Sequence, residues 1–180
     1  LNKLQELEII EKETPDTTQK KRGVYRIKDD FFRFHFTYVY PNKSSLETGE
    51  TQKIKEEIQK NLPKHTSKTF EKVCQQVIRN KTGYTKTGRW WYKENEIDIV
   101  ALNEKQEKIL FGEAKWTNQK TGMKLLKDLE KKSGKVRWQN KDTRKEEYIL
   151  FSKNGFTNEL EKKAEERSDL DLYNLERISE

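Results

Sequence analysis

Three charged residues on two neighbouring apolar segments could support hydrolytic chemistry. Asp98 lies in the run E-N-E-I-D-I-V-A-L, and Glu113 and Lys115 lie in the run I-L-F-G-E-A-K-W after a short polar turn. Both runs have the composition of buried strands, so lone charges within them are costly and are expected to pair or to bind a metal ion. The three residues are therefore the first candidates for a functional site.

Side chains on a strand alternate between its two faces, which predicts the neighbours of each charge. One face of the first strand should hold Ile97, Ile99 and Ala101. Its other face should hold Glu96, Asp98, Val100 and Leu102. On the second strand, one face should hold Ile109, Phe111, Glu113 and Lys115.

The oxygen ligands of Asp98 and Glu113 suit Mg²⁺, which prefers octahedral oxygen coordination. The two histidines and the single cysteine lie elsewhere in the sequence, which argues against zinc. Lys115, two residues after Glu113, should point the same way and could orient a metal-bound water. The pattern D-x14-E-x-K therefore predicts metal-assisted hydrolysis of a phosphodiester.

A helix with one apolar face precedes the two strands, in the run S-K-T-F-E-K-V-C-Q-Q-V-I-R-N. Its helical spacing predicts a buried stripe of Phe70, Val73, Cys74, Val77 and Ile78. Glu71 falls beside Ile78 at the edge of this stripe, from where it could reach the same site.

These motifs resemble the PD-(D/E)XK nuclease superfamily, including archaeal Holliday-junction resolvases and restriction-endonuclease-like proteins. Asp98, Glu113 and Lys115 match its signature, although Ile97 stands where a proline often precedes the first acid. The resemblance implies that Asp98 and Glu113 hold Mg²⁺ or Mn²⁺ and that Lys115 positions the attacking water. It also implies that Glu71 assists and that DNA is the substrate, with Glu96 as an acceptor behind the metal ligands.

A non-catalytic interpretation stays open, because an E-x-K on a strand is usually a solvated ion-pair face. The charged residues would then form an inherited ion-pair network. The domain would bind DNA or a partner protein for an attached ATPase.

A wider resemblance covers roughly residues 20–150. The run G-V-Y-R-I-K-D-D-F-F-R-F-H-F-T-Y-V-Y-P-N, then F-E-x-V-C and the two acidic strands, is similar to the C-terminal region of archaeal-type P-loop ATPases. The resemblance implies an ATPase domain and a winged helix upstream, and a first residue that is not Met fits a fragment of a longer protein. The sequence lacks G-x-x-x-x-G-K-[ST], so we do not expect it to hydrolyse ATP.

The N-terminal part, residues 1–40, should comprise the back half of a winged helix and an aromatic segment. Residues 11–22 would form the wing and touch DNA phosphates through Lys20, Lys21 and Arg22, or else form an ordinary hairpin with a charged tip. The aromatic run of residues 29–40 has the alternation of a strand. Asp30 as an N-cap also permits a helix, which the family resemblance favours.

Residues 41–66 should form a connector with a short helix that Pro63 ends, and residues 67–180 the nuclease-like domain. The order of elements there is helix, three strands, helix, strand, helix, strand. Later helices are expected at residues 122–132 and 157–167, and later strands at 148–152 and 170–175. The predicted fold is α/β and restriction-endonuclease-like: a mixed sheet of four to five strands flanked by helices, with a partial winged-helix remnant.

The composition is compatible with a polyanionic partner, since the formal net charge is +7 and 38% of residues are charged. Arg89, Lys93 and Lys120 could line a phosphate path, or simply be solvated. Three tryptophans near the site could stack on bases, but such residues more often pack a sheet against its helices. They are Trp90, Trp91 and Trp116.

The single cysteine excludes an internal disulfide, and no run of 18 apolar residues is present. A cytoplasmic protein without a membrane segment is the expectation. A homodimer is a further expectation, because cutters of duplexes and junctions often act as dimers.

Overall fold

The computed structural model describes residues 1–15, 23–81 and 83–179. It contains two compact units: among the described residues, the first comprises 1–13 and 23–69, and the second comprises 14–15, 70–81 and 83–179.

The first unit begins with a short helix and a two-stranded ribbon. Helix α1 spans Asn2–Glu6, and strands β1 (Ile10–Glu13) and β2 (Val24–Ile27) pair antiparallel, with Ile10 opposite Ile27. The predicted phosphate contacts of the wing, Lys20, Lys21 and Arg22, lie outside the described residues, so the wing stays a prediction.

The aromatic segment is helical, as the family resemblance implied, and the alternative of a strand is wrong. Helix α2 (Asp30–Phe34) continues into a π-helical turn, a 3₁₀ turn and helix α3, at His35–Val39, Tyr40–Asn42 and Lys43–Glu47. The N-cap is Asp29 rather than Asp30, because the Asp29 carboxylate accepts a 2.9 Å hydrogen bond from the Phe32 N–H.

Helix α4 is a single helix of 29 residues, Gln52–Asn80, with Pro63 inside it, so the predicted helix end at Pro63 is wrong. An interior proline weakens a helix, but packing holds the turns on both sides. In the first unit, the Arg33 guanidinium of α2 donates to the His65 carbonyl and the Thr69 hydroxyl. None of the described helices is long and apolar enough to span a membrane.

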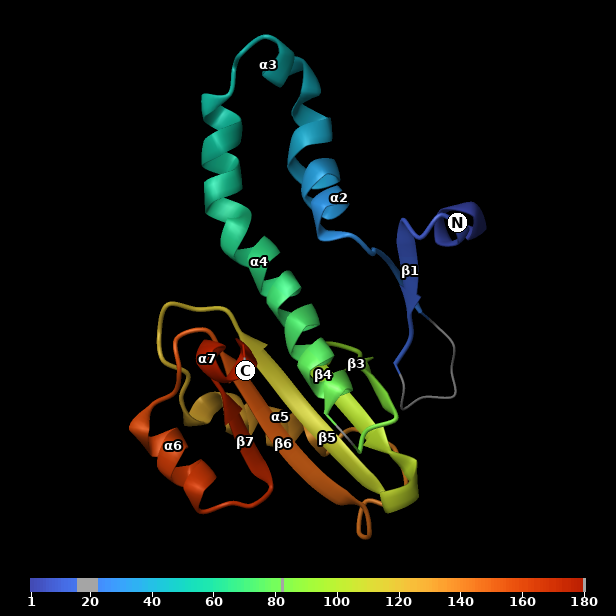
Figure 1. Ribbon diagram of the computed structural model, residues 1–180, viewed down its shortest axis with the longest axis vertical. Helices are drawn as coiled ribbons and strands as arrows, with labels where there is room; N and C mark the ends of the chain where they lie inside the picture. Colours follow the sequence, from blue (N-terminus) through green and yellow to red (C-terminus); the bar gives the residue numbers. More distant parts are fainter. Residues whose placement is uncertain (16–22, 82, 180) are drawn as a thin grey trace. The chain divides into compact units, whose positions relative to one another are not determined.

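The second unit contains a five-stranded mixed sheet in the order β3-β4-β5-β6-β7, which confirms the predicted fold class (Figure 1). The pairs β3–β4 and β4–β5 are antiparallel, whereas the pairs β5–β6 and β6–β7 are parallel. The strands are β3 (Lys86–Tyr92), β4 (Asn95–Asn103), β5 (Lys108–Lys115), β6 (Lys145–Ser152) and β7 (Leu170–Tyr173). A 3₁₀ turn, Glu104–Gln106, joins β4 to β5.

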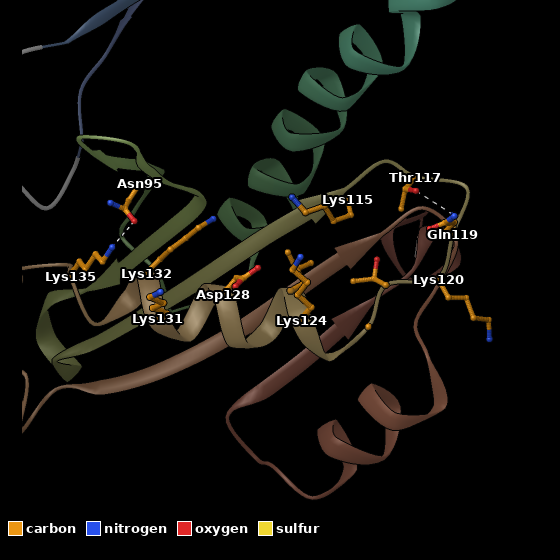
Figure 2. A pocket seen from close by; sticks show the side chains of 13 residues that line it. Asn95, Lys115, Thr117, Gln119, Lys120, Lys124, Asp128, Lys131, Lys132 and Lys135 are labelled. Carbon is orange, nitrogen blue, oxygen red and sulfur yellow. Dashed lines mark hydrogen bonds between the residues drawn. The ribbon is translucent and has the colours of Figure 1, made fainter.

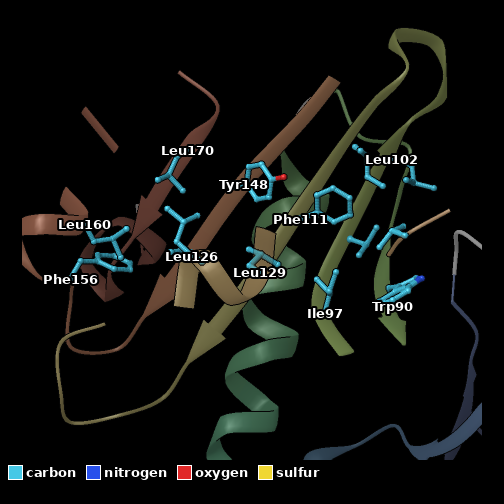
Figure 3. Packing of buried hydrophobic residues seen from close by; sticks show 14 residues of the cluster. Trp90, Ile97, Leu102, Phe111, Leu126, Leu129, Tyr148, Phe156, Leu160 and Leu170 are labelled. Atoms are coloured by element: carbon cyan, nitrogen blue, oxygen red, sulfur yellow. The ribbon is translucent and has the colours of Figure 1, made fainter. Parts of the chain in front are cut away.

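Each face of the sheet has its own core cluster. Helices α5 (Met123–Ser133) and α6 (Asn158–Glu165) cover one face, where Leu126, Leu129 and Leu160 are fully buried (Figure 3). Residues 70–80 of α4 and the final helix α7 (Leu175–Ser179) pack on the other face.

The buried stripe of α4 is confirmed in part. Phe70, Cys74 and Ile78 are buried and Val77 packs beside them, but Val73 is 43% exposed.

A β-bulge in β4 changes the predicted faces of that strand. One residue of β3, Arg89, lies between the partners Gly88 and Trp90, but two residues of β4, Asp98 and Ile99, lie opposite it. Ile97 consequently joins the cluster that faces α5, while Ile99 joins the cluster that faces α4. The prediction that Ile97 and Ile99 share a face is therefore wrong, since strict alternation does not allow for the extra residue.

Candidate active site

Asp98 lies in the bulge, where the β4–β5 pairing reaches its end at Ile99 and Gly112. Its Oδ2 accepts a 3.2 Å hydrogen bond from the Ala114 backbone N–H of β5. The Asp98 side chain thus bonds to β5 just beyond the last backbone pair of the two strands. The neighbouring strand fixes this buried carboxylate next to the segment that carries Glu113 and Lys115.

Arg89, opposite the bulge, is the cation for three carboxylates. Its Nη2 lies 3.4 Å from Oε2 of Glu71 and 3.8 Å from Oδ1 of Asp98, and it also contacts Oε1 of Glu96. The side chain is only 6% exposed. The structure places Arg89 against carboxylates of the protein, and its predicted role in a phosphate path stays a prediction.

Glu113 is buried and is bonded to two lysines. Lys132 of α5 donates a 2.7 Å hydrogen bond to its Oε1, and the Lys115 ammonium lies 3.6 Å from its Oε2. Burial first and then the nearby charge of Asp98 raise the pKa of Glu113, the two lysines lower it, and the net result is a pKa of about 7. Asp98 and Glu113 therefore lie close enough for one charge to influence the other.

Helix α4 supplies the remaining polar contacts. Glu71, predicted at the edge of the apolar stripe, is buried, and the Gln75 side chain donates a 2.8 Å hydrogen bond to the Asp98 carbonyl. The pKa of the buried Cys74 thiol is raised by burial first and then by the charges of Asp98 and Glu71. The helix thus adds two polar side chains, Glu71 and Gln75, from an otherwise apolar surface to the acidic residues of the sheet.

The chemistry of the two carboxylates fits a divalent cation. Mg²⁺ commonly takes one or two carboxylates and keeps several waters, and Asp98 and Glu113 are a neighbouring pair of that kind. Within the described ranges, no group of three or more His, Cys, Asp or Glu side chains is arranged to hold a metal ion. The pair instead has basic partners inside the protein, Arg89 and Lys132.

A basic groove of about 550 Å³ opens beside Glu113, between the end of β5 and helix α5 (Figure 2). Both lysines that contact Glu113 line it. Its lysines are Lys115, Lys120, Lys124, Lys131, Lys132 and Lys135.

Two of the predicted phosphate contacts line hollows of the surface, and their contact with phosphate stays a prediction. Lys120 lines the basic groove, whereas Lys93 lines a second hollow beyond it. Lys124, Lys131 and Lys135 were not predicted. Lys124 and Lys131 are seven residues apart, which puts them on one side of α5, and this spacing was the signal that could have found them; Lys135 lies in the turn after the helix.

The tryptophans serve mainly as packing residues. Trp90 is 2% exposed in the core that faces α5. Trp116 is partly buried, with its ring centroid 5.1 Å from that of Phe70. These two residues confirm the packing interpretation.

Comparisons with known proteins give three matches. Residues 35–147 match a family described as archaeal and bacterial proteins of unknown function, DUF234. The uncharacterized protein MJECL04 of Methanocaldococcus jannaschii is 35% identical over 190 aligned residues, which cover 99% of this chain and 40% of that protein. This chain thus spans about two fifths of the length of that relative.

The third match is to a solved structure. A repair endonuclease from Pyrococcus abyssi is similar with a TM-score of 0.40 and 16% identity, over 56% of this chain and 41% of that one. A likeness at this level carries no argument about function.

Proposed function

We propose that this chain, which belongs to the family of archaeal and bacterial proteins of unknown function (DUF234), is a nuclease-like domain that hydrolyses DNA with a divalent cation. The observation that supports this most is the pair Asp98 and Glu113 on adjoining strands, with the Lys115 ammonium 3.6 Å from Glu113. Two buried carboxylates and an ammonium that lines a basic groove suit a phosphodiester substrate.

Each residue of the candidate site would have its own role in hydrolysis. Asp98 and Glu113 would hold Mg²⁺ or Mn²⁺, which supplies a Lewis acid and a more acidic bound water. Lys115 is 45% exposed at the groove, so it can meet the phosphate and orient the attacking water. Arg89 fixes Asp98 and Glu71 through buried ion pairs, which makes it a positioning residue.

A DNA-cleavage assay with Mg²⁺ or Mn²⁺ tests the proposal. Asp98→Asn and Lys115→Ala should each abolish cleavage without unfolding the chain. Asp142→Asn and Lys163→Ala are the control variants. Asp142 is exposed, and the Lys163 side chain is 43% exposed, a fraction similar to the 45% of Lys115. Metal-dependent cleavage that persists in both site variants rejects the assignment.

A second candidate is a catalytically inactive module that binds DNA or a partner protein. The observation that favours it is that Arg89 and Lys132 already neutralise the carboxylates. The attached ATPase that the family resemblance implies would lie outside this chain, which covers 40% of the length of its longer relative. Calorimetric titration with Mn²⁺ separates the two, because a chain without a cation site should release no binding heat.

A further inference from the structure

The basic groove beside Glu113 carries far more positive charge than the candidate site needs. Six lysines line it together with one acidic residue, Asp128, and several uncharged polar residues. Lys115 and Lys132 contact Glu113, and Lys135 bonds to Asn95. Within the part of the chain that the structure describes, no ion pair is found for Lys120, Lys124 or Lys131. These three ammonium groups are available to an outside anion.

The lysines of the groove are spread along helix α5 and do not converge on one position. Lys124 and Lys131 lie two turns apart on α5, Lys135 lies in the turn just after the helix, and Lys120 lies in the loop before it (Figure 2). A compact ligand would meet a cluster of charges, whereas successive charges along a helix match the repeated phosphates of a polymer.

A second hollow, of about 530 Å³, continues this row of lysines. It shares Asn95 and Lys135 with the groove, and the 2.7 Å hydrogen bond between these two side chains lies where the hollows meet. Lys93 and Arg137 add two more positive charges to its lining, against one negative charge from Glu94.

The second hollow also contains an exposed aromatic ring. Tyr92 is 57% exposed at the end of β3, and the Lys93 ammonium lies 5.6 Å from its ring centroid. An exposed aromatic ring among basic side chains offers a stacking surface for a nucleobase. Bases within a duplex are already stacked on one another, so this surface suits an unpaired strand.

We propose that the two hollows form one track for a single-stranded segment of nucleic acid, with phosphates on the lysines of α5 and a base stacked on Tyr92. This inference rests on the proposed function, since it defines the substrate of the same site. The strand would pass Lys131 and Lys124 and reach Lys115 beside Glu113, so the substrate class would be DNA with a single-stranded region.

Fluorescence anisotropy with the full chain in EDTA tests the track without any cleavage. The probes are a labelled oligothymidylate and a duplex of equal length. Tyr92→Ala should weaken binding of the single strand roughly ten-fold, the order expected for loss of one stacked base. Tyr40→Ala, which removes a tyrosine that is 64% exposed in the first unit, is the control and should leave binding unchanged.

The lysine part of the track has its own readout. Lys131→Ala should weaken binding and reduce the dependence of log K on log salt by about 0.7, the contribution of one phosphate contact on a single strand. Lys163→Ala on α6 should change neither. The track is overturned if Tyr92→Ala leaves single-strand binding intact or weakens duplex binding equally, or if Lys131→Ala leaves the salt dependence unchanged. Intact binding without metal-dependent cleavage would instead reject the proposed function alone.

Discussion

The Lys132 ammonium of α5 lies 2.7 Å from Oε1 of Glu113 on β5. The bond joins the helix that lines the basic groove to a carboxylate of the candidate site. Glu113 is only 2% exposed, so without such a partner its charge would be very costly. Lys132 therefore neutralises the charge of Glu113. A divalent cation bound to Glu113 could take the place of this ammonium group.

The raised pKa of Glu113 predicts how stability changes with pH. The value rises from 4.5 to about 7 in the folded chain, so between these pH values the native state binds more protons than the unfolded state. The contribution of Glu113 is therefore fully present below pH 4.5 and is lost as pH rises through 7, with a total of about 3 kcal/mol. Urea unfolding of wild type and Glu113→Gln across this window measures it. The difference between the two should change with pH; a constant difference contradicts the prediction.

Removal of Lys132 should raise the pH range over which Glu113 titrates. Its hydrogen bond and charge both lower the pKa of Glu113, so Lys132→Gln should raise that pKa further. Carboxyl carbon NMR of the Glu113 titration is the direct measurement. Lys131→Gln, at the exposed neighbouring position, is the matched control and should leave the titration in place. An unshifted Glu113 in Lys132→Gln would mean that this bond does not persist in solution.

Loss of Arg89 should destabilise the chain and make it more responsive to metal. Arg89→Met leaves Glu71 and Asp98 without this buried cation, and breaking such pairs costs about 3–5 kcal/mol. Mn²⁺ should then recover more stability in the variant than in wild type, since the guanidinium no longer competes for Asp98. Thermal unfolding with and without Mn²⁺ measures both effects, with the exposed Arg137→Met as control. Equal Mn²⁺ shifts in variant and wild type would count against a cation at Asp98.

Gly112 on β5 has no room for a side chain. A Cβ there would lie 2.9 Å from Cγ2 of Ile149 and from Cβ of Ile99, both in the core that faces α4. Gly112→Ala should cost about 1–3 kcal/mol of unfolding free energy, the usual result of overpacking. Gly134→Ala is the control, because the nearest atom there is the flexible ammonium of Lys141 at 3.4 Å. Urea denaturation compares them, and equal stabilities would show that the strands move apart readily.

The order and type of the elements in the second unit were predictable from local patterns. Alternation identified β4 and β5, and helical spacing identified α5 with Leu126 and Leu129 inward. Glu71 was also placed at the buried edge of its helix. Each of these features depends on residues that are close together in the sequence, so a local sequence pattern is enough to predict it.

The features that were missed depend on contacts between distant segments. The bulge at Asp98 follows from the β3 pairing, and Pro63 stays within α4 because packing on both sides outweighs its local cost. Arg89 looked like a surface cation, but its burial follows from three carboxylates that come from two other elements. No local pattern contains that information.

A crystal of the chain soaked with Mn²⁺ tests the central claim most directly. The account predicts one anomalous peak in contact with oxygens of both Asp98 and Glu113, at about 2.1 Å as expected for a hard cation of this size. Lys132 would then be displaced from the Glu113 oxygen that it now contacts. A crystal in which Arg89 and Lys132 keep their carboxylate partners, with no peak between Asp98 and Glu113, would contradict the account.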